Sequence, residues 1–203
     1  MNVQQIFSTY DYLSNPLKRA AYCACCGTAT VAKDEGGRVR SSCPRCGFLE
    51  YRNPAPAVSI LISNGDDVLI GMRTPQSFRG GFWCMPCGFV EYDEDFLTAA
   101  CREVEEESGL QVQLKSIINV TCNFLTPDLH SMVIVLRAEP TGGTLKAGDD
   151  LEFVRWFPLS GPLPEFAFAA DKDIIERYAA IRIEGLPIET GFTFKNLRQR
   201  NML

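Results

Sequence analysis

The chain has 203 residues, of which 46% are hydrophobic and 22% are charged, and its formal net charge is −5. This composition is typical of a soluble globular protein with one sizeable domain and a small appendage. The absence of a long apolar span or a secretory segment predicts a cytoplasmic protein with no membrane partner. A sequence pI near 5.0 argues against an extended basic surface, so we expect no nucleic-acid partner.

Two cysteine pairs of the form C-x-x-C-G lie near the start of the chain, with sixteen residues between them. This spacing is typical of a zinc ribbon, in which four thiolates hold one structural Zn²⁺. The total of nine cysteines is odd, which argues against a framework of disulfides and leaves Cys25 as a spare thiol. The expected zinc ligands are Cys23, Cys26, Cys43 and Cys46.

The same segment has a basic side, and zinc ribbons can bind nucleic acids. A few scattered arginines in an acidic chain nevertheless fall short of an electrostatic footprint, so we favour a structural staple for a segment too small to bury much core. A redox role for either pair is disfavoured because neither lies in a βαβ setting. The arginines are Arg38, Arg40, Arg45 and Arg52.

The middle of the chain alternates apolar runs with turns. Residues 57–62 and 68–73 flank Asn64-Gly65-Asp66, which predicts a β-hairpin. Further apolar runs predict strands, and two segments predict helices. Strands mixed with two helices favour an α+β sandwich. The other strands are expected at 112–119, 132–138 and 152–157, and the helices between Asp95 and Gly109 and over 171–183.

The first of these helices carries three glutamates on one face. Asp95 is suited to its N-cap and Gly109 to its C′ position. At about 100° per residue, Glu103, Glu106 and Glu107 share one stripe. They lie in the C-terminal half, where the helix dipole disfavours negative charge. These carboxylates therefore require a positive partner.

A divalent cation meets that requirement best. Residues 91–107 contain eight acidic side chains and one basic one, a net charge of −7. Arg102 can reach Glu106 one turn away, but one guanidinium cannot neutralise three carboxylates. Hard oxygen ligands suit Mg²⁺ or Mn²⁺, which can bridge carboxylates to phosphate oxygens and activate a water. The helix face therefore predicts a magnesium or manganese site rather than a solvated acidic surface.

The segment from Gly88 to Leu110 resembles the Nudix box, G-x5-E-x7-R-E-U-x-E-E-x-G-U with U aliphatic, at every defined position. The resemblance implies the Nudix fold, a mixed β-sheet between α-helices. It also implies a pyrophosphohydrolase that cleaves a nucleoside diphosphate linked to another group. The residues that match the metal-binding carboxylates, the orienting arginine and the acid of the preceding loop are Glu103, Glu106, Glu107, Arg102 and Glu94.

One position departs from the family pattern. Cys87 stands where members usually have the first of two glycines before the box. A backbone carbonyl at this turn often joins the metal shell in the family, so the resemblance implies the Cys87 carbonyl as a further ligand of magnesium or manganese. A side chain at Cys87 is tolerated with negative φ and strained with positive φ.

Residues outside the box must complete the site. The resemblance implies a further acid from a loop before a late strand, as metal ligand or general base, and Asp150 or Glu152 is the expected residue. Two arginines near the loop into the box are expected to hold phosphate oxygens, and two aromatic residues to stack on a base. The alternatives are surface ion pairs and core packing. These substrate-binding candidates are Arg73, Arg79, Phe82 and Phe124.

A zinc ribbon ahead of a Nudix domain resembles the NADH pyrophosphatases. Their signature, close to S-Q-P-W-P-F-P-x-S, has no match in residues 119–127. Pro127 lies near the place where ADP-ribose-cleaving members carry a proline, so ADP-ribose is the first expected substrate, followed by FAD and NADH. The alternatives are a nucleotide-sensing binding protein and a decapping-type RNA pyrophosphohydrolase.

The expected organisation has three parts. Residues 1–50 form an N-terminal segment with the zinc ribbon, residues 51–185 form the Nudix domain, and residues 186–203 form a C-terminal tail. Zinc-ribbon members of the family tend to dimerise, so the resemblance also implies a homodimer.

Overall fold

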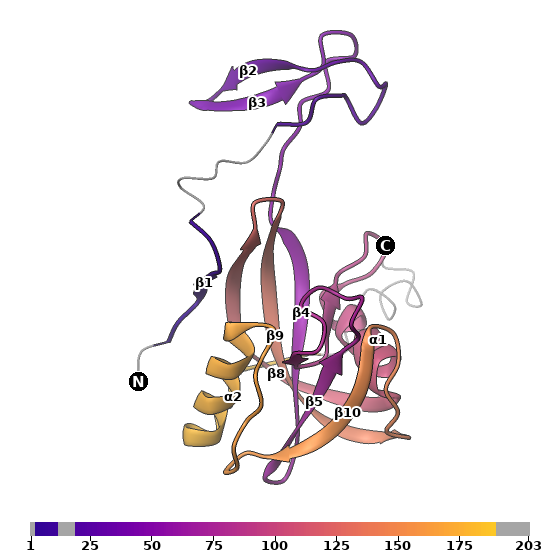
Figure 1. The fold of residues 1–203 in the computed structure, drawn as a ribbon, viewed down its shortest axis with the longest axis vertical. Helices are drawn as coiled ribbons and strands as arrows, with labels where there is room; N and C mark the ends of the chain where they lie inside the picture. Colours follow the sequence, from indigo (N-terminus) through magenta and orange to yellow (C-terminus); the bar gives the residue numbers. More distant parts are fainter. Residues whose placement is uncertain (1–2, 12–18, 190–203) are drawn as a thin grey trace. The chain divides into compact units, whose positions relative to one another are not determined.

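The computed structural model describes residues 3–11 and 19–189 and divides them into two units (Figure 1). The ribbon unit comprises residues 8–54, apart from the undescribed residues 12–18, and residues 124–130. The sheet unit comprises residues 3–7, 55–123 and 131–189. The elements in chain order are β1 (Ile6–Ser8), β2 (Val31–Glu35), β3 (Arg38–Ser42), β4 (Ala55–Asn64), β5 (Asp67–Arg73), β6 (Trp83–Cys84), β7 (Cys87–Phe89), α1 (Phe96–Ser108), β8 (Leu110–Thr126), β9 (Leu129–Gly143), β10 (Leu151–Pro158), α2 (Ala169–Ile181) and β11 (Leu186–Pro187).

A mixed sheet forms the centre of the sheet unit. Its described strands run in the order β1-β8-β9-β4-β5-β10, while β11, β6 and β7 pair with β8, β5 and β4. Strands β4 and β9 are parallel, from the pair Ala55 and Ser131 to the pair Ile62 and Ala138. Strands β5 and β10 are antiparallel. This arrangement confirms the predicted mixed sheet.

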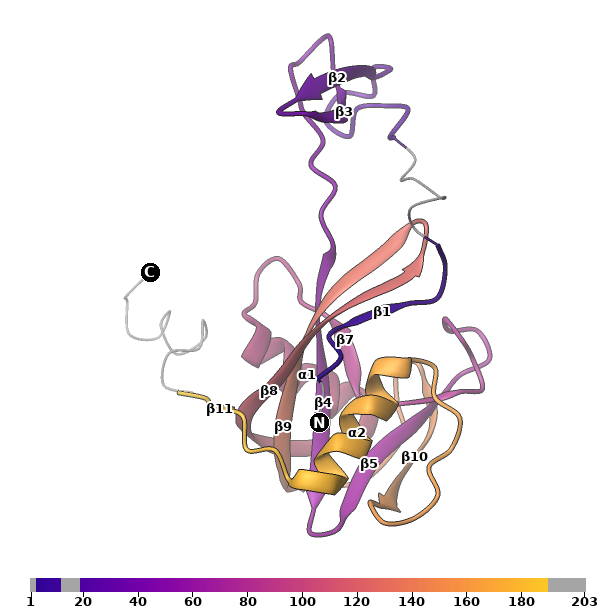
Figure 2. The same ribbon diagram turned by 90° about the vertical axis from the view of Figure 1, so that its left-hand side faces the viewer.

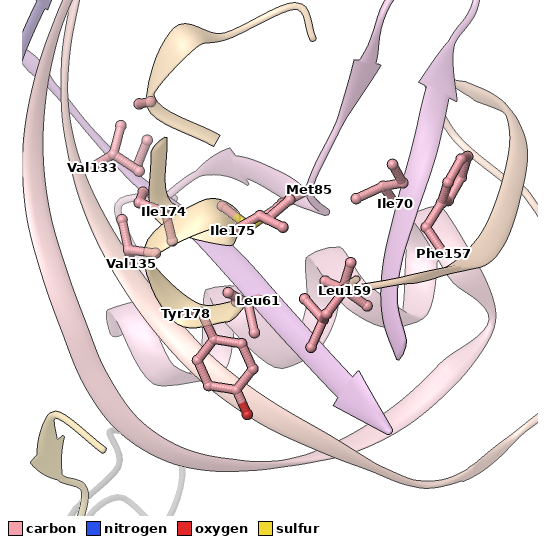
Figure 3. Packing of buried hydrophobic residues seen from close by; sticks show 13 residues of the cluster. Leu61, Ile70, Met85, Val133, Val135, Phe157, Leu159, Ile174, Ile175 and Tyr178 are labelled. Carbon is pink, nitrogen blue, oxygen red and sulfur yellow. The ribbon is translucent and has the colours of Figure 1, made fainter. Parts of the chain in front are cut away.

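The two helices cover opposite faces of this sheet (Figures 1 and 2). Side chains alternate between the faces of a strand, and β4 is apolar on both. Its Leu61 packs in the same buried cluster as Ile174 and Ile175 of α2, which Figure 3 shows at close range. Its Ile60 packs on the other side, in the cluster that includes Val104 of α1. The sandwich expected from the sequence is therefore confirmed.

Several element boundaries differ from the sequence expectations. The hairpin around Gly65 is confirmed, with β4 ending at Asn64 and β5 beginning at Asp67. Helix α2 begins at Ala169, two residues before the expected start, and Phe168 provides no side-chain cap bond that the sequence could have signalled. Strands β8 and β9 extend well beyond the predicted ranges 112–119 and 132–138. The predicted ranges are too short because polar residues interrupt the apolar pattern of both strands.

The ribbon unit contains an antiparallel hairpin of β2 and β3 (Figure 1). Gly36 and Gly37 form its turn with φ values of 63° and 81°, a conformation that glycine adopts readily. The sequence predicts a domain boundary after residue 50, and the structure divides the two units after Pro54. Of the expected tail, β11 pairs with β8, and residues 190–203 lie outside the described residues. Among the described residues, no helix is long and apolar enough to cross a membrane.

Candidate functional site

The glutamate helix has the caps that the sequence predicts. The Asp95 carboxylate accepts hydrogen bonds from the backbone N–H groups of Leu97 and Thr98, at 2.9 and 3.0 Å. Gly109 ends the helix in the left-handed conformation, with φ 67°. A side chain at Gly109 would also overlap the backbone of the loop that follows β9. Both ends of α1 are therefore fixed by local chemistry.

Two of the three box glutamates are buried. Glu103 is 6% exposed and Glu107 is 1% exposed, whereas the Glu106 side chain is half exposed. Strand β7 lies over them: the Cys87 N–H donates a hydrogen bond to Glu107 Oε2 at 2.8 Å. A Cβ at Gly88 would overlap the Glu103 carboxylate, so only glycine permits this approach. The first residue of the box thus makes room for one of its carboxylates.

Arg102 connects the helix to the preceding loop. Its guanidinium binds the Glu94 carboxylate in a two-point contact, with nitrogen–oxygen distances of 2.6 and 3.1 Å. Its Nη1 also donates to Glu103 at 2.8 Å and to Glu106 at 2.9 Å. A further bond to the Phe89 carbonyl, at 3.1 Å, holds the end of β7. One arginine therefore orients three of the acids predicted for the site.

Burial shifts the titration of these groups. It raises the pKa of Glu103, with smaller opposing contributions from Arg102. Burial also raises the pKa of Glu107 well above its usual range, and nearby Cys87 and Asp150 add to the shift. The Glu94 pKa is lowered, because its carboxylate is held by Arg102. Two carboxylates are thus buried with too little positive charge, which is the environment that a bound cation would stabilise.

A third acid joins the buried pair from the loop before β10. One carboxylate oxygen of each of Glu103, Glu107 and Asp149 lies within 4.8 Å of the others. Asp149 has φ 49°, an uncommon left-handed conformation for a residue with a side chain. The family resemblance implies Asp150 or Glu152 for this position, and Asp149 is the neighbour of Asp150 in the chain. The glycine before Asp149, Gly148, is the sequence feature that could have pointed to this turn. A side chain at Gly148 would overlap the carbonyl of Glu106, so the loop passes close to the helix here.

This donor set fits Mg²⁺ or Mn²⁺. All three groups are hard carboxylate oxygens, and the Glu107 carboxylate is almost wholly buried. Glu106 could supply a further carboxylate from the same helix. A water alone could hydrogen-bond these groups but would not offset the burial of their negative charges.

Asp150 contacts Glu107 but lies outside the group of three converging carboxylates. It forms an ion pair with Arg73, whose side chain is buried and whose Nε donates to the Phe78 carbonyl at 2.7 Å. Asp150 also contributes to the raised pKa of Glu107. Arg73 is buried beside Asp150, and its expected role in holding substrate phosphates remains a prediction.

The remaining sequence candidates lie in varied settings. Glu152 is exposed and is not part of the metal-capable group. Arg79 is exposed, and its Nη1 donates to the Ala167 carbonyl at 2.8 Å. Phe82 packs at the edge of a small buried cluster. Phe124 belongs to the ribbon unit, where its ring packs edge-on against His130 with centroids 4.4 Å apart. Their functional roles remain predictions.

Cys87 adopts the tolerated backbone conformation. Outside glycine, positive φ values in the described residues occur only at Arg79, Asp149 and Arg182. Cys87 lies in β7 opposite Ser59 of β4. A contact with the Cys84 thiol, together with burial, raises the Cys87 pKa well above its usual range. Its thiol is therefore not activated as a nucleophile.

Sequence reasoning missed one buried acid near the site. Asp171, in the first turn of α2, is 4% exposed and accepts a hydrogen bond from the Met85 N–H at 3.0 Å. Burial raises its pKa to about 7, against opposing effects from the Met85 bond and the charge of Arg73. Its partners Met85 and Arg73 are distant in the sequence, so no local sequence signal identifies it.

The four ribbon cysteines converge as predicted. Their Sγ atoms lie within 4.8 Å of one another, and three of the separations are 3.5, 3.6 and 3.7 Å. Tetrahedral Zn²⁺ with Zn–S bonds of about 2.3 Å requires sulfur separations of about 3.8 Å, whereas a disulfide requires about 2 Å. The two knuckles repeat the same turn, since Gly27 and Gly47 donate to the carbonyls of Cys23 and Cys43. This geometry fits zinc, and Cys25 is exposed outside the cluster.

Comparison with known proteins identifies the family of this chain. The NUDIX domain family matches residues 53–178. The chain therefore belongs to the Nudix family. Among solved structures, it is similar to a NUDIX hydrolase from Nitrosomonas europaea, with a TM-score of 0.71 and 26% identity, covering 83% of this chain and 95% of that one.

Two curated relatives have more specific names. The chain is 34% identical over 164 residues to the NAD-capped RNA hydrolase NudC of Pseudomonas aeruginosa. The aligned region covers 79% of this chain and 56% of that protein. It is 38% identical over 132 residues to the ADP-ribose pyrophosphatase of Methanocaldococcus jannaschii. This aligned region covers 63% of this chain and 75% of that protein. The chain thus spans little more than half the length of the NudC relative.

Proposed function

We propose that this chain is a divalent-metal-dependent pyrophosphohydrolase that cleaves the diphosphate linkage of a nucleoside diphosphate derivative. One observation carries the proposal. Glu103 and Glu107 of a complete Nudix box are buried, and their oxygens converge with one of Asp149. Buried carboxylates that outnumber the nearby positive charges are costly, so their burial together supports a cation as part of the working site.

The side chains around the cluster have distinct proposed roles. Glu103, Glu106 and Glu107 hold Mg²⁺ or Mn²⁺, with the Cys87 carbonyl as a further ligand. Such an ion lowers the pKa of a bound water and neutralises charge on the diphosphate. Arg102 fixes the direction of two of these carboxylates, and the Cys87 N–H fixes Glu107.

The acid from outside the box has two candidates with different positions. Asp149 reaches the cluster directly, which favours it as a metal ligand or as the base that accepts a proton from the attacking water. Asp150 is held by Arg73 and contacts Glu107, which favours a positioning role for Asp150. Glu152 is less favoured because it is exposed.

ADP-ribose is the first substrate that we propose. The resemblance to the named ADP-ribose pyrophosphatase, at 38% identity, supports it, as does the missing NADH signature. ADP-ribose carries an adenosine diphosphate joined to a second sugar, so its diphosphate suits the proposed metal site.

NAD-capped RNA is the second candidate. Residues 53–203 make up 151 of the 203 residues, about 74%, so a match over 79% of this chain must include part of the first 52 residues. The similarity to the named NAD-capped RNA hydrolase thus extends beyond the Nudix domain into the ribbon segment. The expectation of no nucleic-acid partner is therefore not supported, and we do not retain it.

We further propose structural zinc at the four cysteines, a cytoplasmic location and a homodimer. The sulfur separations support zinc. Reduced cysteines suit a reducing compartment. The dimer rests on the family resemblance alone.

Product analysis tests the proposed activity. The 203-residue protein is incubated with Mg²⁺ or Mn²⁺ and, in separate reactions, with ADP-ribose, NADH, FAD or NAD-capped RNA. We expect ADP-ribose to give AMP and ribose 5-phosphate. Intact substrates throughout the panel with both metals would contradict the proposal. Hydrolysis of the RNA cap without ADP-ribose cleavage would make the second candidate the function.

A further inference from the structure

One face of the ribbon hairpin is more basic than folding requires. Residues directly opposite in an antiparallel pair point to the same face, and Lys33 is opposite Arg40. Two like charges directly across a sheet are destabilising. The next pair on the same face, Glu35 and Arg38, adds one acid and one base. This face therefore carries three positive groups and one negative group.

An exposed aromatic ring lies beside these cations. The Arg40 guanidinium is 4.5 Å from the centroid of the Tyr51 ring, and Tyr51 is 58% exposed. Arg40 Nε is buried and has no hydrogen-bond partner among the described residues. The Lys33 ammonium binds Glu35 at 2.9 Å, and both side chains are about half exposed. An exposed tyrosine with an adjacent guanidinium is a platform on which a base can stack.

We propose that this ribbon face (Lys33, Glu35, Arg38, Arg40 and Tyr51) binds single-stranded RNA, with phosphates near the cations and a base on Tyr51. The inference rests on NAD-capped RNA as the second candidate substrate, for which it supplies a contact to the chain that follows the cap. Charge complementarity favours a polyanion over an apolar partner. Tyr51 favours a strand with unpaired bases, because paired bases cannot stack on a side chain.

The test is binding of a short, uncapped, fluorescent single-stranded RNA to the 203-residue protein, measured by fluorescence anisotropy at several salt concentrations. Two ribbon variants separate the two contributions. Lys33→Gln with Arg38→Gln removes two exposed charges without touching the contact between Arg40 and Tyr51. Tyr51→Leu removes the ring and keeps the charges. Lys172→Gln, an exposed lysine of α2, is the matched control.

The two variants have different expected signatures. The double variant should bind RNA at least about fivefold more weakly and flatten the slope of log K against log salt by about 1.4, since each phosphate contact contributes about 0.7. Tyr51→Leu should also weaken binding at least about fivefold, with the slope unchanged. Lys172→Gln should match the unmodified protein. Zinc content confirms that each ribbon remains folded.

Two results would overturn the inference. One is no binding of the RNA by the unmodified protein at about 50 mM salt. The other is equal binding by the unmodified protein and both ribbon variants. Because this assay needs no cap and no hydrolysis, its outcome is separate from that of the proposed activity. RNA binding without cap cleavage would support the RNA-binding surface and refute NAD-capped RNA as a substrate. Cap cleavage without RNA binding would support NAD-capped RNA as a substrate and refute the RNA-binding surface.

Discussion

Asp171 shows how burial changes a single carboxyl group. It is nearly inaccessible to solvent, and its pKa is raised to about 7. A carboxyl in the unfolded chain titrates near pH 3.9. Between these values the folded protein retains a proton that the unfolded chain has released. Stability contributed by Asp171 is therefore present at low pH and is lost as pH rises toward 7.

Asp171→Asn should remove this dependence. Asparagine stays neutral and can still accept the hydrogen bond from Met85 N–H. From pH 5 to pH 7, the free energy of unfolding of the variant should improve relative to the unmodified protein, by up to about 1.4 kcal/mol per pH unit. Denaturant titrations at the two pH values measure it. Glu176→Gln, an exposed acid on the same helix, should show no such trend. A constant difference between Asp171→Asn and the unmodified protein would contradict the account.

At the scale of elements, α1 depends on its N-cap. Asp95 accepts bonds from two backbone N–H groups and from the Thr98 hydroxyl. Asp95→Ala should lower the free energy of unfolding by about 1 kcal/mol. Glu105→Ala removes the same charge from the exposed face of the helix and should have a smaller effect. Thermal unfolding of both variants measures the two losses of stability. Equal losses in Asp95→Ala and Glu105→Ala would show that the N-cap hydrogen bonds make no specific contribution.

Arg102 determines how α1 presents its carboxylates. Arg102→Lys keeps the charge but loses the forked contacts to Glu94, Glu103 and Glu106. We expect activity at low Mg²⁺ to fall by about 10- to 100-fold and to recover partly as Mg²⁺ is raised. A rate that is unchanged at every Mg²⁺ concentration would exclude the orienting role.

At the scale of the whole molecule, local patterns were informative where chemistry is local. The caps at Asp95 and Gly109, the glutamate face and the cysteine knuckles each depend on neighbours within a few turns, and the structure has them where the pattern indicated. The fold class followed from the box and the alternating apolar runs.

Features set by distant partners were not predictable. Asp149, which has a left-handed backbone, joins the oxygens of Glu103 and Glu107, whereas Asp150 contacts Glu107 and pairs with Arg73. Side-chain type alone does not reveal this difference. Arg73 is buried because β10 brings Asp150 beside it, 77 residues later in the chain. Such placements depend on tertiary packing, and one sequence contains little information on it.

The zinc site of the ribbon unit can be tested separately from the carboxylate site. Freshly reduced protein should contain about one zinc per chain, and Cys26→Ser should lower this content strongly. Since none of the box residues belongs to this unit, the variant should still hydrolyse ADP-ribose. Elemental analysis together with the hydrolysis assay tests both statements. Full zinc content in Cys26→Ser would contradict the four-thiolate site.

We propose that the buried carboxylates of α1 form a catalytic metal site. The most direct measurement is the rate of ADP-ribose hydrolysis as a function of Mg²⁺ concentration, for the unmodified protein, Glu107→Gln and the matched variant Glu105→Gln. The account predicts Mg²⁺-dependent hydrolysis, a loss of more than about 100-fold in Glu107→Gln and little change in Glu105→Gln. Equal rates for Glu107→Gln and the unmodified protein would contradict it.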